Sequence, residues 1–191
     1  VRSWTSRHRS QLERAESAAT SVASFAKMSP LQRLAFDAMA FSISPARIEE
    51  LRKTFEELDT DGSGTLSLDE VQRLVGAQGG AEQAFDALDL GGAKEVTYTE
   101  FIAAMVSAQE RFQDDEHIRA AFEELDKDGS GAISLDEVIG VIGESADKMM
   151  LDSADTDGDG KVDFAEFKRL VKTKPAADAV DKTPATPGAI E

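Results

Sequence analysis

Apolar residues recur along most of this chain at intervals of three, four and seven positions. This spacing places them on one face of an α-helix, so each run predicts an amphipathic helix. The runs flank short polar segments rich in acidic residues and glycine. The apolar positions before two of these segments are Ile48, Leu51, Phe55 and Leu58, and Ile118, Ala121, Phe122 and Leu125. Those that follow the segments are Val71 and Leu74, Val138 and Ile142, and Phe167, Leu170 and Val171. The repeating unit is therefore helix, polar segment, helix.

Three of the polar segments, residues 59–70, 126–137 and 155–166, share one twelve-residue pattern. Each begins with aspartate, carries side-chain oxygens at alternate positions, has glycine at position 6 and ends in glutamate. This pattern is typical of the calcium-binding EF-hand loop. Calcium takes about 6–8 oxygen ligands, and twelve residues can surround it when alternate residues point inward and glycine allows a sharp turn. The sequence predicts an all-α fold with two pairs of helix–loop–helix units.

The predicted ligands occupy positions 1, 3, 5, 7, 9 and 12 of each loop, and position 7 contributes its carbonyl oxygen. In the first loop they are Asp59, Asp61, Ser63, Thr65, Ser67 and Glu70, with Ser67 acting directly or through water. In the third loop they are Asp126, Asp128, Ser130, Ala132, Ser134 and Glu137. In the fourth loop they are Asp155, Asp157, Asp159, Lys161, Asp163 and Glu166. The fourth loop has five carboxylates against three in each of the others, so we expect it to bind calcium most tightly and to suit magnesium as well.

A second, degenerate copy of the loop spans residues 89–100. It keeps Asp89 at position 1 and Glu100 at position 12, but Gly91 and Ala93 provide no side-chain oxygen and Lys94 replaces the turn glycine. We expect it not to hold calcium. Acidic turns that bind no metal are common. Three complete copies of the pattern, each in frame with helices, nevertheless indicate that the first, third and fourth loops bind calcium. The aliphatic residues at position 8 should pair as short antiparallel strands, first loop with second and third with fourth; they are Leu66, Val96, Ile133 and Val162.

The pattern divides the chain into four parts: a basic segment over 1–44, a first pair of helix–loop–helix units over 45–108, a second pair over 109–172, and a tail over 173–191. Within the first part, Ser29 followed by Pro30 predicts a helix over 30–42. Its apolar stripe contains Leu31, Leu34, Ala35, Ala38 and Phe41, widened by Phe36 and Met39. The dipeptide at 44–45, Ser-Pro, predicts the start of the next helix. The tail is rich in Pro, Ala, Thr and Lys, which predicts disorder.

Composition narrows the choice of partners. The net charge of -16 disfavours nucleic acid, whose phosphates would be repelled. The chain has no cysteine and two histidines, which excludes thiolate sites and disfavours zinc. No apolar run is long enough to span a membrane, and no signal peptide is visible. The chain begins without Met. We therefore expect part of a longer cytoplasmic protein, of undetermined oligomeric state.

Residues 31–41 (LQRLAFDAMAF), 99–106 (TEFIAAMV) and 115–126 (DEHIRAAFEELD) resemble the regulatory region of the calcium-dependent protein kinases of plants and alveolate protists. The resemblance covers roughly residues 20–172 and implies a junction helix followed by a calmodulin-like domain. It also implies that this helix blocks a serine/threonine kinase until calcium causes the two helix–loop–helix pairs of the calmodulin-like domain to bind the helix. Two basic stretches, 7–10 and 14–17, resemble the substrate-mimicking part of such a junction, or form a solvated linker.

Three functions remain open at the level of sequence. The chain is a kinase regulatory module, a free-standing calcium sensor for separate targets, or a calcium buffer. No glycine-rich phosphate loop, HRD triplet or DFG triplet is present, so the chain is not itself predicted to be an enzyme. The helix over 30–42 is either a fixed part of the core or a tethered target that the helix–loop–helix pairs bind when calcium opens them. The second alternative makes the chain a regulatory module.

Overall fold

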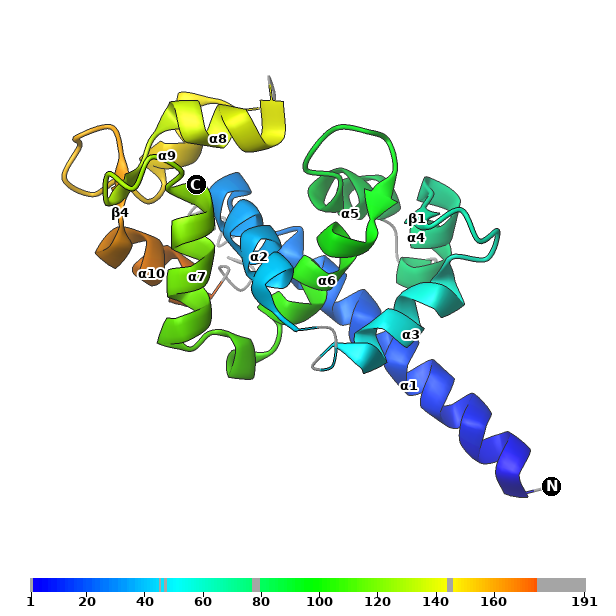
Figure 1. Cartoon of the computed structure of the whole chain (residues 1–191). Helices are drawn as coiled ribbons and strands as arrows, with labels where there is room; N and C mark the ends of the chain where they lie inside the picture. Colours follow the sequence, from blue (N-terminus) through cyan, green and yellow to red (C-terminus); the bar gives the residue numbers. More distant parts are fainter. Residues whose placement is uncertain (1, 45, 47, 77–79, 144–145, 175–191) are drawn as a thin grey trace, which may run out of the picture.

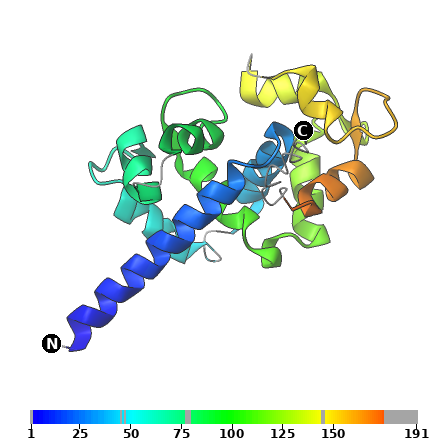
Figure 2. The same cartoon turned by 180° about the vertical axis from the view of Figure 1, so that it is seen from behind.

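The computed structural model describes residues 2–44, 46, 48–76, 80–143 and 146–174, and within these ranges it describes side chains from Glu13 onward except that of Arg111. This part of the chain contains ten α-helices, a short 3-10 helix and four strands of two residues each. The all-α prediction is confirmed. Two groups of helices lie on either side of one central helix, and a long helix runs across the back of the molecule (Figure 1; Figure 2).

The first group contains two helix–loop–helix units. Its elements are α3 (Glu49–Leu58), β1 (Thr65–Leu66), α4 (Leu68–Val75), α5 (Ala81–Leu88), β2 (Val96–Thr97) and α6 (Tyr98–Ser107). The two strands are antiparallel, with Leu66 opposite Val96, which confirms the predicted pairing. At the base of the loops the Phe55 ring meets the edges of Tyr98 and Phe101, with centroids 5.3 and 5.6 Å apart.

The second group repeats this arrangement. Its elements are η3 (Glu110–Phe112), α7 (Asp115–Leu125), β3 (Ala132–Ile133), α8 (Leu135–Ile142), α9 (Lys148–Asp152), β4 (Val162–Asp163) and α10 (Phe164–Lys172). Ile133 lies opposite Val162 in the antiparallel ladder, again as predicted. The Phe122 ring meets Phe164 and Phe167 with centroids 5.4 and 5.6 Å apart. The same aromatic triplet thus joins the helices in both groups.

Helix α1 (Arg2–Phe25) was not predicted from the sequence, where residues 1–44 were expected to be a basic segment that becomes helical only near its end. Ala18, Val22 and Phe25 are buried at intervals of four and three, and this spacing was the available signal. The helix contacts α3, α4, α5 and α6 of the first group. Its first turns project away from the rest of the molecule (Figure 2). The basic stretch at 7–10 lies outside the described side chains.

Helix α2 (Pro30–Ser42) is the central helix, and it begins where the sequence predicts. Ser29 is the N-cap, and its hydroxyl accepts a hydrogen bond from the Gln32 backbone N–H at 3.2 Å. The helix lies between α6 and α7, so it touches both groups (Figure 1). Eight of its thirteen residues are buried: Leu31, Gln32, Leu34, Ala35, Phe36, Ala38, Met39 and Ala40.

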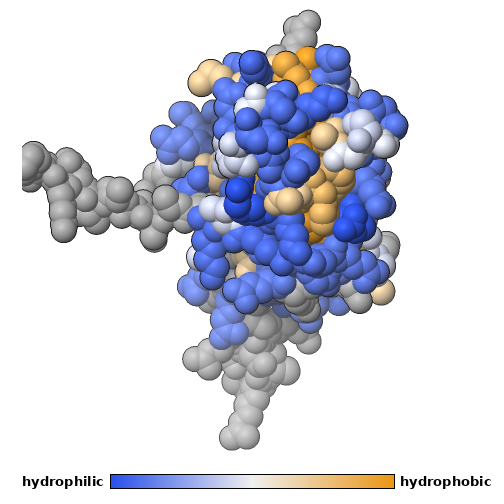
Figure 3. All heavy atoms as spheres, turned by 90° about the vertical axis from the view of Figure 1, so that its left-hand side faces the viewer, coloured by the Kyte–Doolittle hydropathy of each residue, from blue (hydrophilic) through white to orange (hydrophobic). Residues whose placement is uncertain are grey.

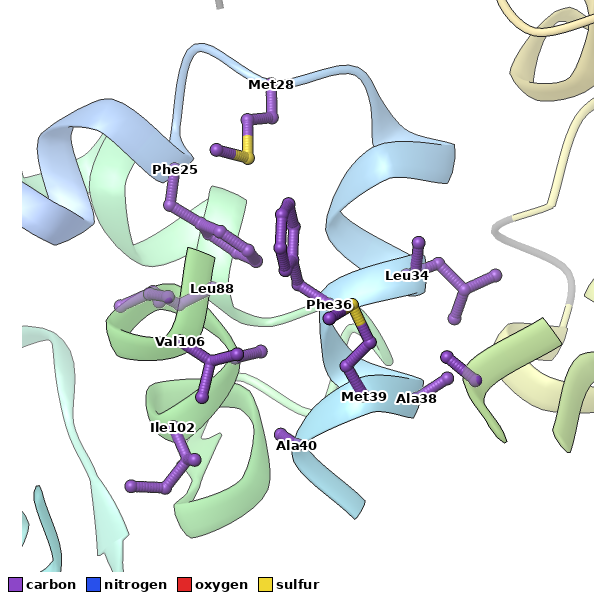
Figure 4. Close-up of a cluster of buried hydrophobic side chains, with 14 of the residues drawn as sticks. Phe25, Met28, Leu34, Phe36, Ala38, Met39, Ala40, Leu88, Ile102 and Val106 are labelled. Carbon is purple, nitrogen blue, oxygen red and sulfur yellow. The ribbon is translucent and has the colours of Figure 1, made fainter. Parts of the chain in front are cut away.

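The apolar stripe predicted for α2 is wrong at one position. Phe41 is 76% exposed, whereas Ala40 and Ile43 beside it are buried, because other elements cover only one side of the end of the helix. Phe36 instead points toward Phe25 of α1 and is fully buried (Figure 4). Leu88 of α5 and Val106 of α6 line the same cluster (Figure 4). The two N-terminal helices therefore share one core with the first group.

The remaining predictions concern the ends of elements. The second helix start, expected at residues 44–45, is wrong, since α3 begins at Glu49; Pro45 itself lies outside the described residues. Most of the predicted disordered tail, residues 175–191, also lies outside them. None of the helices that the structure describes is long and apolar enough to cross a membrane.

Candidate metal centres

Three groups of carboxylates come together in the described part of the chain, one in each of the complete loops. They are Asp59, Asp61 and Glu70; Asp126, Asp128 and Glu137; and Asp155, Asp157 and Asp159. Within each group one oxygen from every residue lies within 4.8 Å of the others. The predicted residues at positions 1 and 3 are thus assembled in all three loops. Glu166 belongs to no such group, although Glu70 and Glu137 do.

The first loop shows how the backbone holds its aspartate. Asp59 accepts hydrogen bonds from the backbone N–H of Ser63 at 3.0 Å and of Gly64 at 2.9 Å. These bonds wrap the chain around the carboxylate. Gly64 has a φ of +85°, a left-handed conformation that glycine adopts without a steric penalty. The third and fourth loops repeat the second bond, from Gly131 to Asp126 and from Gly160 to Asp155.

The glutamate at position 12 is held from both ends of its loop. Glu70 accepts hydrogen bonds from the backbone N–H of Thr60 at 2.7 Å and of Ser67 at 3.0 Å. Burial by itself would raise the pKa of Glu70, but the bonds from Ser67 and Thr60 outweigh it and hold the pKa at about 2. The pKa values of Glu137 and Glu166 are lowered by equivalent bonds, for Glu137 against the effect of burial. All three carboxylates are therefore anionic at neutral pH.

The residue at position 9 also has a structural role, beside the ligand role that the sequence predicts for it. Ser67, Ser134 and Asp163 are the N-caps of α4, α8 and α10, and each forms a capping box with the glutamate three residues later. The Ser67 hydroxyl donates to the Glu70 carboxylate at 2.9 Å. The position-9 side chain thus fixes the orientation of the position-12 carboxylate and starts the helix that follows.

The donor sets fit calcium. Carboxylate, hydroxyl and carbonyl oxygens are the ligands that hard cations prefer, and the groups contain neither imidazole nor thiolate. In the first loop the Ser63 hydroxyl lies 3.0 Å from the Thr65 carbonyl oxygen, so positions 5 and 7 are close together as well. Three carboxylates so near one another repel, and a divalent cation between them would offset that repulsion.

Comparison with known sequences agrees with this geometry. The family of EF-hand domain pairs matches the chain over residues 48–106, 80–143 and 115–172. The chain belongs to the EF-hand family. The three overlapping matches run from the first helix–loop–helix unit to the last, so they cover the degenerate unit as well as the three complete ones.

Among curated relatives, the EF-hand region is similar to calcium-dependent protein kinases. Calcium-dependent protein kinase 21 of Arabidopsis thaliana is 32% identical over 161 residues, which cover 78% of this chain and 30% of that protein. Calcium-dependent protein kinase 3 of Oryza sativa subsp. japonica is 31% identical over 162 residues, covering 78% and 29%. Calcium-dependent protein kinase 2 of Zea mays is 29% identical over 160 residues, covering 78% and 31%. The chain spans about 30% of the length of these relatives, in agreement with the absence of kinase motifs from its sequence.

The degenerate EF-hand keeps the fold of its loop without the ligands. Asp89 accepts hydrogen bonds from Ala93 and Lys94 at 2.9 and 2.8 Å, and Glu100 accepts from Leu90 and Thr97 at 2.9 and 2.8 Å. Lys94 takes the place of the turn glycine with a φ of +63°. A non-glycine residue costs about 1–2 kcal/mol in this conformation. The loop is retained despite that cost, and it pairs with the first loop through β1 and β2.

Two EF-hands contain a feature that sequence reasoning missed. The hydroxyls of Thr60 and Thr156, at position 2, donate to Glu70 and Glu166 at 2.9 and 2.6 Å. Each threonine hydroxyl accepts in turn from an arginine on the following helix: Arg73 for Thr60 and Arg169 for Thr156, both at 2.9 Å. The signal was present, because threonine and arginine are thirteen residues apart in both units. Lys127 occupies position 2 of the third loop, which lacks this relay.

Proposed function

We propose that this chain is a calcium-sensing regulatory module in which ion binding by three EF-hands controls whether α2 is captured. The observation that carries the proposal is the burial of α2 between α6 and α7. α6 begins at Tyr98 and contains Glu100, the last residue of the second loop, while α7 leads directly into the third loop at Asp126. A change in the direction of either helix would therefore change the surface on which α2 lies.

The proposed ligands are those that the sequence predicted at positions 1, 3, 5, 7, 9 and 12 of the first, third and fourth loops, and the position-9 side chain also holds the position-12 glutamate. Calcium, when bound, supplies positive charge between converging carboxylates. The position-12 glutamate lies in the first turn of the helix after the loop, and the position-1 aspartate follows the helix before it. An ion that binds both carboxylates therefore acts on both helices. Drawing these two together changes the angle between the helices. The five carboxylates of the fourth loop also suit magnesium.

The partner that we propose is a serine/threonine kinase domain in the same protein, because the relatives are named as calcium-dependent protein kinases. In the absence of calcium the junction formed by α1 and α2 would contact and block that domain. With the ions bound, the EF-hand pairs over 45–108 and 109–172 would hold α2, as in the structure, and remove it from the kinase. We assign such a protein to the cytoplasm.

Hydrogen exchange of the full chain tests the proposal. With calcium, amides of α2 should be protected by the buried contacts, and with chelator they should exchange faster. The control is a chain with Glu70→Gln, Glu137→Gln and Glu166→Gln, in which calcium should produce no such contrast. Equal protection of α2 in both conditions would mean that α2 is a fixed part of the core, and regulation by capture would be wrong.

A free-standing sensor is the second candidate, and exposed apolar side chains favour it. Ile139 and Val141 of α8 are 41% and 44% exposed, and Met149 of α9 is 74% exposed. Figure 3 shows apolar side chains among hydrophilic ones on the side of the molecule that carries the second group. Calcium-dependent binding of a separate protein by the full chain, while α2 remains protected, would support this candidate over the first.

A further inference from the structure

Two consecutive polar residues of helix α2, Gln32 and Arg33, lie among its mostly apolar buried residues. Gln32 is only 4% exposed, and the guanidinium of Arg33 is buried enough that desolvation lowers its pKa. Burying polar groups costs free energy unless they are hydrogen-bonded. The Gln32 amide and one terminal nitrogen of Arg33 bind carbonyl groups at the end of another helix, whereas the Arg33 Nε is buried without a partner among the described residues.

Gln32 binds the C-terminal end of α10. Its side-chain Nε2 donates to the backbone oxygen of Leu170 at 3.0 Å and to that of Thr173 at 2.6 Å. Carbonyls in the last turn of a helix lack their usual donor four residues on; the Leu170 oxygen accepts from the Thr173 backbone N–H at 3.2 Å, and Gln32 supplies a further donor. α10 follows the fourth loop without interruption, and Gln32 therefore joins α2 to the exit helix of that EF-hand.

Arg33 binds the C-terminal end of α5 in the same way. Its Nη1 donates to the Ala87 oxygen at 3.0 Å. A cationic donor is favourable there because the C-terminal end of a helix carries partial negative charge. α5 ends at Leu88, immediately before the degenerate loop. Two neighbouring residues of α2 thus cap one helix from each EF-hand pair.

We propose that Gln32 and Arg33 are the specificity-determining residues of α2, which fix its position between the two EF-hand pairs by capping α10 and α5. The apolar contacts of α2 are not directional, so they tolerate displacement. A shift by one residue moves a helix about 1.5 Å along its axis and turns it by about 100°. Both donors would then miss their carbonyls. A helix with the same apolar spacing but no donors at these positions should be held less well.

This inference rests on the proposed function only in taking α2 as the captured helix; the capping itself is independent of calcium. The test uses the full chain with Gln32→Met, which keeps the length and volume of the side chain but has no donor. The matched control is Gln72→Met, the same change at an exposed position of α4. Hydrogen exchange is measured for α2 and for the last turn of α10, and far-UV circular dichroism checks the helix content.

Gln32→Met should accelerate exchange in both segments about 10-fold or more, since the two hydrogen bonds to α10 are lost. Gln72→Met should leave both unchanged. Exchange in the Gln32→Met chain equal to that of the parent would overturn the proposal. Should that chain lose helix content, Arg33→Met provides the same comparison at the end of α5, where unchanged exchange would equally refute it.

A change of charge separates capping from packing. Gln32→Glu keeps the size of the side chain, but its carboxylate faces two carbonyl oxygens and repels them. Protonation converts it to a donor, so the ratio of variant to parent exchange rates should fall as the pH is lowered. A ratio independent of pH would indicate a steric role and contradict the proposal. Calcium could leave the protection of α2 unchanged in the parent while the Gln32 variants still exchange faster than the parent. In that case the regulatory proposal is wrong and the capping proposal is supported.

Discussion

Asp37 of α2 lies in an environment that is unfavourable for a carboxylate. Its Oδ1 is buried without a hydrogen-bond partner among the described residues. Burial raises the pKa of Asp37 to about 7, and the negative charge of Glu100 in the degenerate loop adds to the effect. A carboxylic acid at this contact weakens the attachment of α2 whenever it is ionised.

Asp37→Asn should make the chain more stable at high pH. The pKa of Asp37 is higher in the folded chain than in the unfolded one, so its stabilising contribution is greatest below about pH 4 and declines as the pH rises through 7. Between pH 6 and 8 the parent should lose about 1 kcal/mol that the variant keeps. Denaturant unfolding at the two pH values, in saturating calcium, measures this. Asp86→Asn, at an exposed position of α5, should behave like the parent.

The three complete loops should differ in affinity because they differ in carboxylate count. Asp155→Ala removes position 1 from the loop with five carboxylates, and Asp59→Ala removes it from a loop with three. We expect Asp155→Ala to cause the larger loss of calcium affinity in calorimetric titration. A larger loss with Asp59→Ala would show that carboxylate count does not set the order of affinity, since the first and fourth loops both carry the threonine–arginine relay.

At the scale of elements, the degenerate loop should be repairable. Asp89 and Glu100 are already in place, and an added Cβ at Gly91 would have no atom within 4 Å. The combined change Gly91→Asp, Ala93→Asp and Lys94→Gly supplies the missing oxygens, removes the ammonium group and restores glycine at the positive φ. Calorimetry should then show one more bound calcium than in the parent. Lys94→Gly alone adds no ligand and should leave the stoichiometry unchanged.

The local elements were predictable because their signals lie within a few residues. Loops, strand pairing and the start of α2 follow from Ser29, from the glycines at position 6 and from the aliphatic residues at position 8. The long-range contacts were not predictable. The caps made by Gln32 connect residues 138 and 141 positions apart, and nothing near Gln32 in the sequence indicates them. Phe41 was assigned to the buried face because periodicity does not show where a covering surface ends.

For the whole molecule, charge distribution should make calcium binding sensitive to salt. Residues 1–47 contain seven Lys or Arg and three Asp or Glu, while the complete chain has a net charge of -16. The acidity therefore lies in the part that contains the loops. Added salt screens this field, so calcium affinity should fall as potassium chloride is raised. Affinity independent of salt would show that only the charges inside each loop matter.

The short connection between α2 and α3 has a consequence for competition. α2 ends at Ser42 and α3 begins at Glu49, so the two are joined by six residues. A short tether of this kind keeps a helix near its binding surface at an effective concentration on the order of millimolar. A peptide from another protein must overcome that local excess before it can replace α2. Even a loosely held α2 would thus exclude most competitors, and selectivity for the chain's own helix follows from connectivity as well as from contacts.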